Sequence, residues 1–122
     1  WAARGMHGFL VFKDTMWVIG GRQYVTGPNK QVRTLNDVWS STDGKDWSVA
    51  TINPSWRSRA GHGAVVSLDQ SNPPREFMYI TGGRHDDGSQ SHYLNDVWRS
   101  EDGITWTQIT AHAGWHGRWL HR

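Results

Sequence analysis

The feature that most constrains this chain is an internal repeat. The stretch from Leu35 to Trp47 (LNDVWSSTDGKDW) returns 59 positions later as the stretch from Leu94 to Trp106 (LNDVWRSEDGITW). A period of this length corresponds to one supersecondary unit, and such a unit buries its apolar faces only by stacking against its neighbours. The repeat therefore fixes the architecture before any single residue is considered, and it directs the search for function to the loops.

Two further motifs repeat once this register is known. The segment MWVIGGR at positions 16–22 matches MYITGGR at positions 78–84, and both contain a double glycine. The spacing changes between units fall in polar, Pro- or Gly-bearing stretches, where loops absorb them. We expect a first unit at 1–55, a second at 56–114 and the start of a third at 115–122. The motif Trp-x-x-Arg-x-x-His occurs at Trp1, Arg4 and His7, at Trp56, Arg59 and His62, and at Trp115, Arg118 and His121.

Each unit is predicted to contain four short strands. Apolar runs of strand length come first, and the second run is expected to end at the double glycine. Two segments of alternating polar and apolar residues follow, with Asp-Gly between them as a tight hairpin signal. No segment shows a helical period, so each unit is predicted to be a four-stranded antiparallel meander. The predicted strands are 8–12, 16–19, 37–40 and 46–49 in the first unit and 63–66, 78–80, 96–99 and 105–109 in the second.

Composition narrows the class of protein. The chain has 122 residues, of which 36% are hydrophobic and nine are tryptophan, so a small globular fold is expected. No apolar run is long enough to span a bilayer. The net charge of +2 is small and its basic residues are scattered, so nucleic acid is not an expected partner. Cysteine is absent, which excludes disulfides and thiolate metal sites but does not fix a compartment; secretion is the compartment we favour.

The order of these motifs resembles a kelch repeat, and is similar to the bacterial-type kelch propellers of the galactose-oxidase central-domain group. The resemblance implies an all-β fold in which two four-stranded antiparallel kelch blades form part of a β-propeller of six or more blades. Each Asp-Gly hairpin also resembles the Asp-box of sialidases, shortened by one residue between Asp and Gly. That second likeness supports a propeller hairpin and says little about chemistry.

Two blades cannot close a ring, because an open pair leaves apolar faces and strand edges exposed to water. The expected partners are therefore further blades, either from the same longer chain or from a homotrimer that makes six blades. In a trimer closed head to tail, the Trp-x-x-Arg-x-x-His segments at the two ends of the chain would compete for one place. We therefore favour further blades on the same polypeptide.

Arginines are the leading candidates for a binding site. Arg22 and Arg84 directly follow the double glycines, and the resemblance implies the loop positions at which kelch adaptors of ubiquitin ligases grip acidic peptides. Arg4, Arg59 and Arg118 lie in connectors expected to share that face of the molecule. The alternative is structural: these arginines would bond neighbouring carbonyl groups or the carboxylates of the Asn-Asp pairs, and so hold the blades in register.

Tryptophans and histidines give weaker candidates. Trp17, Trp39, Trp47, Trp98 and Trp106 are expected to pack between blades, whereas the connector residues Trp56 and Trp115 are candidates for stacking on a glycan. The second unit's long loop contains His85, Asp87 and His92, a ligand set that suits zinc. A solvated loop tip is the favoured interpretation of that set. No metal or other cofactor is expected.

Three classes of function remain open. The favoured one is a non-catalytic module that binds a protein, peptide or glycan through its loop face. The second is part of a kelch-type propeller enzyme, similar to sialic-acid epimerases or copper-radical oxidases. No cysteine exists for the Cys–Tyr crosslink of the oxidases, and no catalytic spacing stands out. The third is a structural element of a larger assembly.

Overall fold

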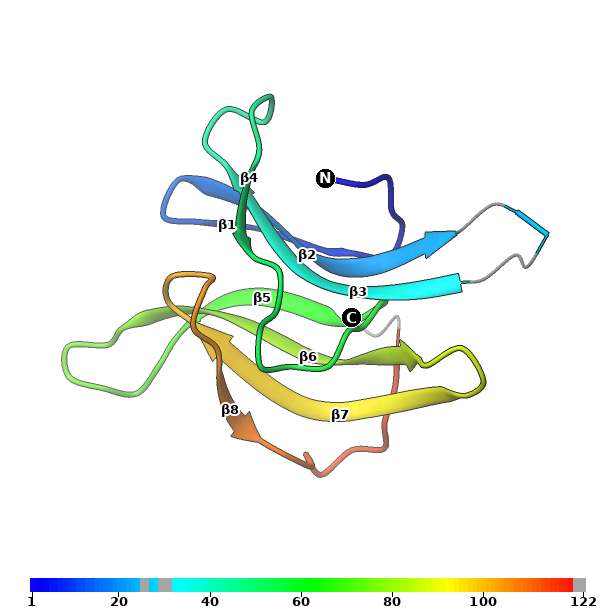
Figure 1. Cartoon of the computed structure of the whole chain (residues 1–122). Coiled ribbons are helices and arrows are strands. Elements are labelled where there is room, and N and C mark those ends of the chain that lie inside the picture. The colour runs from blue at the N-terminus through cyan, green and yellow to red at the C-terminus, as the bar shows by residue number, and fades with distance from the viewer. Residues whose placement is uncertain (25–26, 29–31, 120–122) are drawn as a thin grey trace.

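The computed structural model describes residues 1–24, 27–28 and 32–119. Two four-stranded antiparallel sheets stack face to face, and each sheet has its strands in chain order (Figure 1). The four-stranded meander expected for each unit is therefore confirmed. The first sheet contains β1 (Gly8–Phe12), β2 (Thr15–Tyr24), β3 (Val32–Ser41) and β4 (Ser48–Thr51); the second contains β5 (Gly63–Leu68), β6 (Glu76–Asp86), β7 (Ser91–Ser100) and β8 (Thr107–Thr110).

The double glycines do not end the second strand of each sheet, which corrects the expectation from sequence. β2 and β6 continue past them, and each forms a bulge at that point, between Ile19 and Gly21 and between Thr81 and Gly83. Gly21 and Gly83 have φ values of 117° and 98°, which favour glycine. A Cβ atom at Gly21 would lie 2.9 Å from Cβ of His7. The glycines therefore let the connector cross close to the strand.

The Asp-Gly hairpins are built identically in the two sheets. Ser41 Oγ accepts a hydrogen bond from Gly44 N at 2.8 Å. Asp43 Oδ1 accepts hydrogen bonds from the backbone N–H groups of Lys45 and Asp46. Ser100, Asp102 and Gly103 repeat these bonds with the same 2.8 Å distance from Gly103 N to Ser100 Oγ. Gly44 and Gly103 have φ values of 77° and 76°. The repeated sequence therefore encodes a repeated turn, as the Asp-Gly signal predicted.

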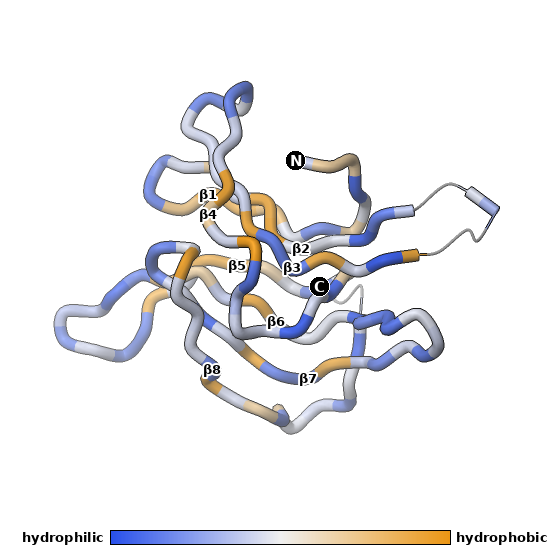
Figure 2. Tube along the Cα trace, in the orientation of Figure 1, coloured by the Kyte–Doolittle hydropathy of each residue, from blue (hydrophilic) through white to orange (hydrophobic). Residues whose placement is uncertain are grey.

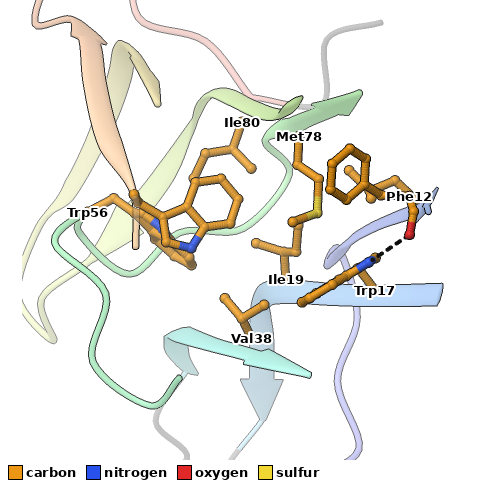
Figure 3. Packing of buried hydrophobic residues seen from close by; sticks show 9 residues of the cluster. Phe12, Trp17, Ile19, Val38, Trp56, Met78 and Ile80 are labelled. Atoms are coloured by element: carbon orange, nitrogen blue, oxygen red, sulfur yellow. Dashed lines mark hydrogen bonds between the residues drawn. The ribbon is translucent and has the colours of Figure 1, made fainter. Parts of the chain in front are cut away.

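The hydrophobic core fills the space between the two sheets (Figure 3). Trp17, Ile19 and Val38 of the first sheet face Met78 and Ile80 of the second. β2 and β6 contain runs of apolar residues, whereas the hairpin turns are hydrophilic (Figure 2). Of the five tryptophans expected between blades, Trp17 and Trp106 are buried core residues and Trp98 packs against the core.

The other two tryptophans of that set lie elsewhere. Trp39 pairs with Val18, so it lies on the face of the first sheet turned away from the second. Trp47 contacts Trp1, with ring centroids 5.6 Å apart. Both sites would become inter-blade positions only if another sheet packed on that face. The described residues include no helix long and apolar enough to cross a membrane.

Candidate functional site

The connectors and the ends of β2 and β6 lie at one end of the two sheets, which we call the loop face (Figure 1). Gly5 forms an antiparallel bridge with Arg22, and Ala60 forms the corresponding bridge with Arg84. The two backbone hydrogen bonds of each bridge measure 2.8–2.9 Å. The structure thus places the arginines after the double glycines beside the connector arginines, on a common face.

Two of the connector arginines are buried in internal ion pairs. Arg4 binds both carboxylate oxygens of Asp37 at 2.5 and 2.9 Å, and Arg59 binds those of Asp96 at 2.7 and 2.9 Å. Each also donates to the carbonyl of the first glycine of the nearby pair. The side chain of Arg59 is 0% exposed and that of Arg4 is 1% exposed. These guanidinium groups therefore lock the connectors to the sheets, and a ligand cannot reach them.

The two carboxylates of these ion pairs have lowered pKa values. Burial raises the pKa of Asp96, but the hydrogen bonds and charge of Arg59, together with the hydrogen bond from Trp98 Nε1, outweigh burial and hold the pKa below 3.8. The pKa of Asp37 is lowered by the same balance, with Arg4 and Trp39 as the partners. Both aspartates are charged at neutral pH, as a bidentate arginine pair requires.

Arg118 repeats only half of this arrangement. Its Nε donates to the carbonyl of His116 at 3.3 Å, as Arg59 Nε does to Arg57 at 3.1 Å. Its backbone bonds Leu94 and Gly83, as the backbone of Arg59 bonds Leu35 and Gly21. However, Arg118 is exposed, and its guanidinium forms no ion pair with a carboxylate among the described residues. The third residue of this motif, His121, lies outside the described residues.

Arg84 and Arg22 differ from each other although they occupy repeated positions. Arg84 Nε donates to Asp86 Oδ1 at 2.8 Å, and the guanidinium lies 5.4 Å from the ring of Trp119. Arg22 stacks on the exposed ring of Tyr24 at 5.2 Å. Its Nε is buried and has no hydrogen-bond partner among the described residues. Arg84 therefore has an internal ion-pair partner, whereas Arg22 has none among the described residues.

Asp86 lies between the zinc candidates His85 and Asp87 and was considered with them only as a possible metal ligand, but the structure gives it a different role on the loop face. Its side chain is 10% exposed. Oδ1 accepts from Arg84 and from Ser91, whereas Oδ2 is buried and has no hydrogen-bond partner within the part of the chain that the structure describes. Burial raises the pKa of Asp86, but the hydrogen bonds from Ser91 and Arg84 and the charges of Arg84 and Arg22 lower it overall. The first unit has Tyr24 at this position, so the repeat itself gave no signal for it.

A polar network joins the two sheets at the loop face, but it is not a nucleophilic pair. His85 Nδ1 lies 2.9 Å from both Ser58 Oγ and the Ser58 carbonyl oxygen. Because a carbonyl oxygen only accepts, Nδ1 carries the proton and cannot take one from the serine. Ser58 Oγ instead bonds Thr34 Oγ1 at 2.9 Å. The network therefore holds Thr34 of β3 against the second sheet.

The histidines and the aspartate considered as metal ligands are not arranged as a metal site, although the rings of His85 and His92 lie 5.9 Å apart. His92 Nε2 contacts Asp87 Oδ2 at 3.0 Å, while His85 is turned toward Ser58. Asp87 also accepts from the backbone N–H groups of Ser89 and Gln90, which makes it the cap of the loop. Among the described residues no group of three or more His, Cys, Asp or Glu is arranged to hold a metal ion.

The two connector tryptophans have different environments. Trp56 is 1% exposed and packs edge-on against Trp106, with centroids 5.9 Å apart. The structure therefore corrects its assignment as an exposed stacking platform: the connector turns the indole into the space between the sheets. Trp115 is 38% exposed and remains accessible.

A second concave surface lies between the inner strands β1 and β5 and was not expected from sequence. His7, Phe9, His62, Val65 and Thr81 contribute to its lining. His7 Nδ1 is buried and has no hydrogen-bond partner among residues 1–24, 27–28 and 32–119. Burial, followed by the charge of Arg4, lowers the pKa of His7. Neutral imidazole is thus the favoured form at this surface.

Comparison with known proteins identifies the fold. No protein-family model and no curated protein matches the chain. The solved structure of YjhT superposes with a TM-score of 0.69 at 13% sequence identity, over 95% of this chain. This chain spans 39% of the length of the YjhT chain. The two sheets are therefore two neighbouring blades of a kelch-like β-propeller fold.

Proposed function

We propose that this chain is a kelch propeller segment that acts as a non-catalytic binding module through its loop face, with an acidic peptide or protein segment as ligand. Further blades, on a longer chain or on other copies, complete the ring. The observation that carries the proposal is the state of Arg22. It is half-buried on the loop face beside exposed Tyr24, and the ion pairs found among the described residues do not include its guanidinium group.

The other polar groups of the loop face support a binding role over catalysis. The guanidinium groups of Arg4 and Arg59 are already bound in internal ion pairs. His85 Nδ1 is oriented to donate to the Ser58 carbonyl oxygen. The charges of Arg22 and Arg84 act on the single carboxylate of Asp86, so these three side chains together carry one excess positive charge. An anionic group that approaches Arg22 would gain a charge-assisted hydrogen bond, and the ring of Tyr24 adds apolar contact area.

Arg22→Gln is expected to weaken binding of a fluorescein-labelled hexaglutamate peptide about tenfold, measured by fluorescence polarisation at low salt. One charge-assisted hydrogen bond contributes about 1.5–3 kcal/mol, and about 1.4 kcal/mol corresponds to a factor of ten. Affinity of the unchanged protein should also fall as salt is added, because the contact is exposed and screened.

The matched control is Arg33→Gln, which removes an exposed arginine from the neighbouring strand, close to Arg22. This change should leave affinity within a factor of two. Equal loss from both substitutions would show that binding follows net charge rather than the site. Tighter binding of a hexaglutamine peptide than of hexaglutamate would contradict the acidic ligand.

A further inference from the structure

A small pocket lies on the loop face at the junction of the two blades, with a volume of about 190 Å³. Val32 of β3 contributes its wall from the first blade, and Arg84, Asp86 and residues 88–91 contribute the walls from the second. Pockets for drug-sized ligands measure about 300–1,000 Å³, so this one suits a single side chain. Both blades that form its walls belong to this chain, so the pocket does not depend on further blades.

One acceptor on the wall of this pocket has no donor. Asp86 Oδ1 accepts hydrogen bonds from Arg84 Nε at 2.8 Å and from Ser91 Oγ at 2.7 Å. Asp86 Oδ2 is buried, and no residue among 1–24, 27–28 and 32–119 donates to it. The side chain as a whole is 10% exposed. A buried acceptor without a donor is unfavourable, so a ligand that donates to Oδ2 gains free energy that a fully bonded carboxylate would not supply.

The charges around Asp86 select a neutral donor. Burial raises the pKa of Asp86, but the hydrogen bonds from Ser91 and Arg84 and the charges of Arg84 and Arg22 lower it overall. Both carboxylate oxygens therefore accept at neutral pH. Arg84 already forms an ion pair with this carboxylate. An ammonium or guanidinium group of a ligand would meet the like charges of Arg84 and Arg22, whereas an amide N–H or a hydroxyl group would not.

A carboxamide fits this pocket better than a hydroxyl group. Its NH2 donates to Asp86 Oδ2 while its carbonyl oxygen still accepts. The pocket wall also contains N–H donors, in the guanidinium group of Arg84 and in the side chain of Gln90. Val32 provides an apolar surface for the methylene groups of an Asn or Gln side chain. A hydroxyl group would satisfy Oδ2 but would leave those donors unused.

The β6–β7 loop must shift for a ligand to reach Oδ2. Residues 87–91 are all exposed, so the loop is not packed beneath other parts of the protein. The bonds that shape it are internal: Asp87 Oδ1 accepts from Ser89 N and Gln90 N, and Asp87 N donates to the Gln90 carbonyl. The loop can therefore move outward as a unit while these bonds stay intact, which opens a path from the pocket to Asp86.

We propose that this pocket binds the side-chain carboxamide of an Asn or Gln residue that lies close to the acidic residue of the peptide ligand. The amide donates to Asp86 Oδ2, and its methylene groups pack on Val32. This inference rests on the proposed function for its peptide context, because Arg22 binds the acidic group and the pocket binds its neighbour. The ligand is then an acidic segment that contains a carboxamide side chain, rather than any acidic segment.

Nuclear magnetic resonance of the ¹⁵N-labelled protein tests the pocket without any acidic peptide. N-acetylglutamine methylamide should shift the backbone amide signals of residues 88–91 in a saturable titration. The matched probe is the γ-methyl ester of N-acetylglutamate methylamide, which has nearly the same length and a side-chain carbonyl but no side-chain N–H. It should bind about fivefold more weakly, or worse. Equal binding of the two probes, or no shifts at these residues, overturns the proposal.

Asp86→Asn should abolish the preference for the amide over the ester. Arg84 and Ser91 both donate to the position of Oδ1, so the asparagine places its oxygen there and its NH2 at the position of Oδ2, which no longer accepts. The control, Asp46→Asn, makes the same change in charge at an exposed hairpin residue and should keep the preference. A preference that survives Asp86→Asn contradicts the proposal. If that variant unfolds, the two probes on the unchanged protein still decide.

Peptides connect the pocket to the proposed ligand. Labelled hexaglutamate is compared with a set of peptides in each of which one glutamate is replaced by glutamine. One or more of the set should bind about threefold tighter than hexaglutamate despite the smaller charge, and Asp86→Asn should remove the gain. If Arg22→Gln changes nothing while this gain persists, the acidic ligand is wrong and the pocket stands. If binding of hexaglutamate depends on Arg22 but no glutamine peptide binds more tightly, the pocket is wrong and the acidic ligand stands.

Discussion

Replacing Arg59 by methionine should lower the free energy of unfolding by about 3–5 kcal/mol, because it leaves the carboxylate of Asp96 buried without its cation. Asp96 keeps 14% of its side chain exposed, and its remaining side-chain partner is Trp98 Nε1 at 2.8 Å. The methionine also loses the bond to the Gly82 carbonyl. Urea unfolding followed by far-ultraviolet circular dichroism measures the change through the shift in midpoint.

The control is Arg57→Met, two residues earlier in the same connector, where the side chain is exposed. It should change stability by less than about 0.5 kcal/mol. Asp96→Asn alone leaves the Arg59 charge buried and should also be strongly destabilising. The double variant should lose much less than the sum of the two single changes, because neither charge is then left alone. Additive losses would show that the pair contributes through packing rather than charge.

The loss of stability in Arg59→Met should depend on pH in a predictable direction. In the unchanged protein the pKa of Asp96 is held below 3.8, so the stabilisation it brings is complete above that pH and is lost as the pH falls through the lowered value. In Arg59→Met, burial still raises the pKa of Asp96, and only the hydrogen bond from Trp98 and a backbone hydrogen bond at Asp96 remain to lower it. The variant should therefore gain stability as the pH falls from 7 toward 4, while the contribution of this group in the unchanged protein stays constant. The stability deficit should shrink on acidification.

The sequence predicted the fold well because the repeat reports backbone structure twice. Hairpin, strand order and the all-β class all follow from residues that recur at fixed spacing, such as Asp43 and Asp102. The double glycines misled only about where β2 and β6 end. In isolation a Gly-Gly pair suggests a turn, but here both residues take positive φ within the ladder so that a connector can pass. That requirement depends on a segment distant in sequence.

The candidate site was predicted less completely, for two physical reasons. Repetition marks what every blade needs, so Arg4 and Arg59 stood out although they are internal braces. Residues that serve one surface differ between the two units. Asp86 corresponds to Tyr24 in the first unit, so repetition did not mark it as a binding residue. Trp56 was assigned to the surface because its segment is a connector. Its burial depends on contact with Trp106 of the next hairpin, which spacing alone does not show.

Gly103→Ala should destabilise the protein by about 2–4 kcal/mol, whereas Gly44→Ala should cost only about 1 kcal/mol. Both glycines sit in the same turn with φ values of 76° and 77°, so the conformational cost of a side chain is shared, at about 1 kcal/mol. They differ in surroundings. A Cβ atom at Gly103 meets two ring atoms of buried Trp17 at 2.1 and 2.5 Å, whereas one at Gly44 meets the flexible end of Met16 at 3.1 Å.

The difference between the two substitutions isolates the packing of one blade on the next, since overfilling a core typically costs about 1–3 kcal/mol. Trp17→Ala should remove this difference in stability. In the Trp17→Ala background, Gly103→Ala is expected to lower the free energy of unfolding no more than Gly44→Ala does in the unchanged protein. Chemical denaturation of the unchanged protein, Gly103→Ala, Trp17→Ala and the double variant completes this double-mutant cycle, and Gly44→Ala is the reference. Equal costs for the two glycine substitutions, with Trp17 present, would mean that the rings and hairpins of neighbouring blades do not fit together as described.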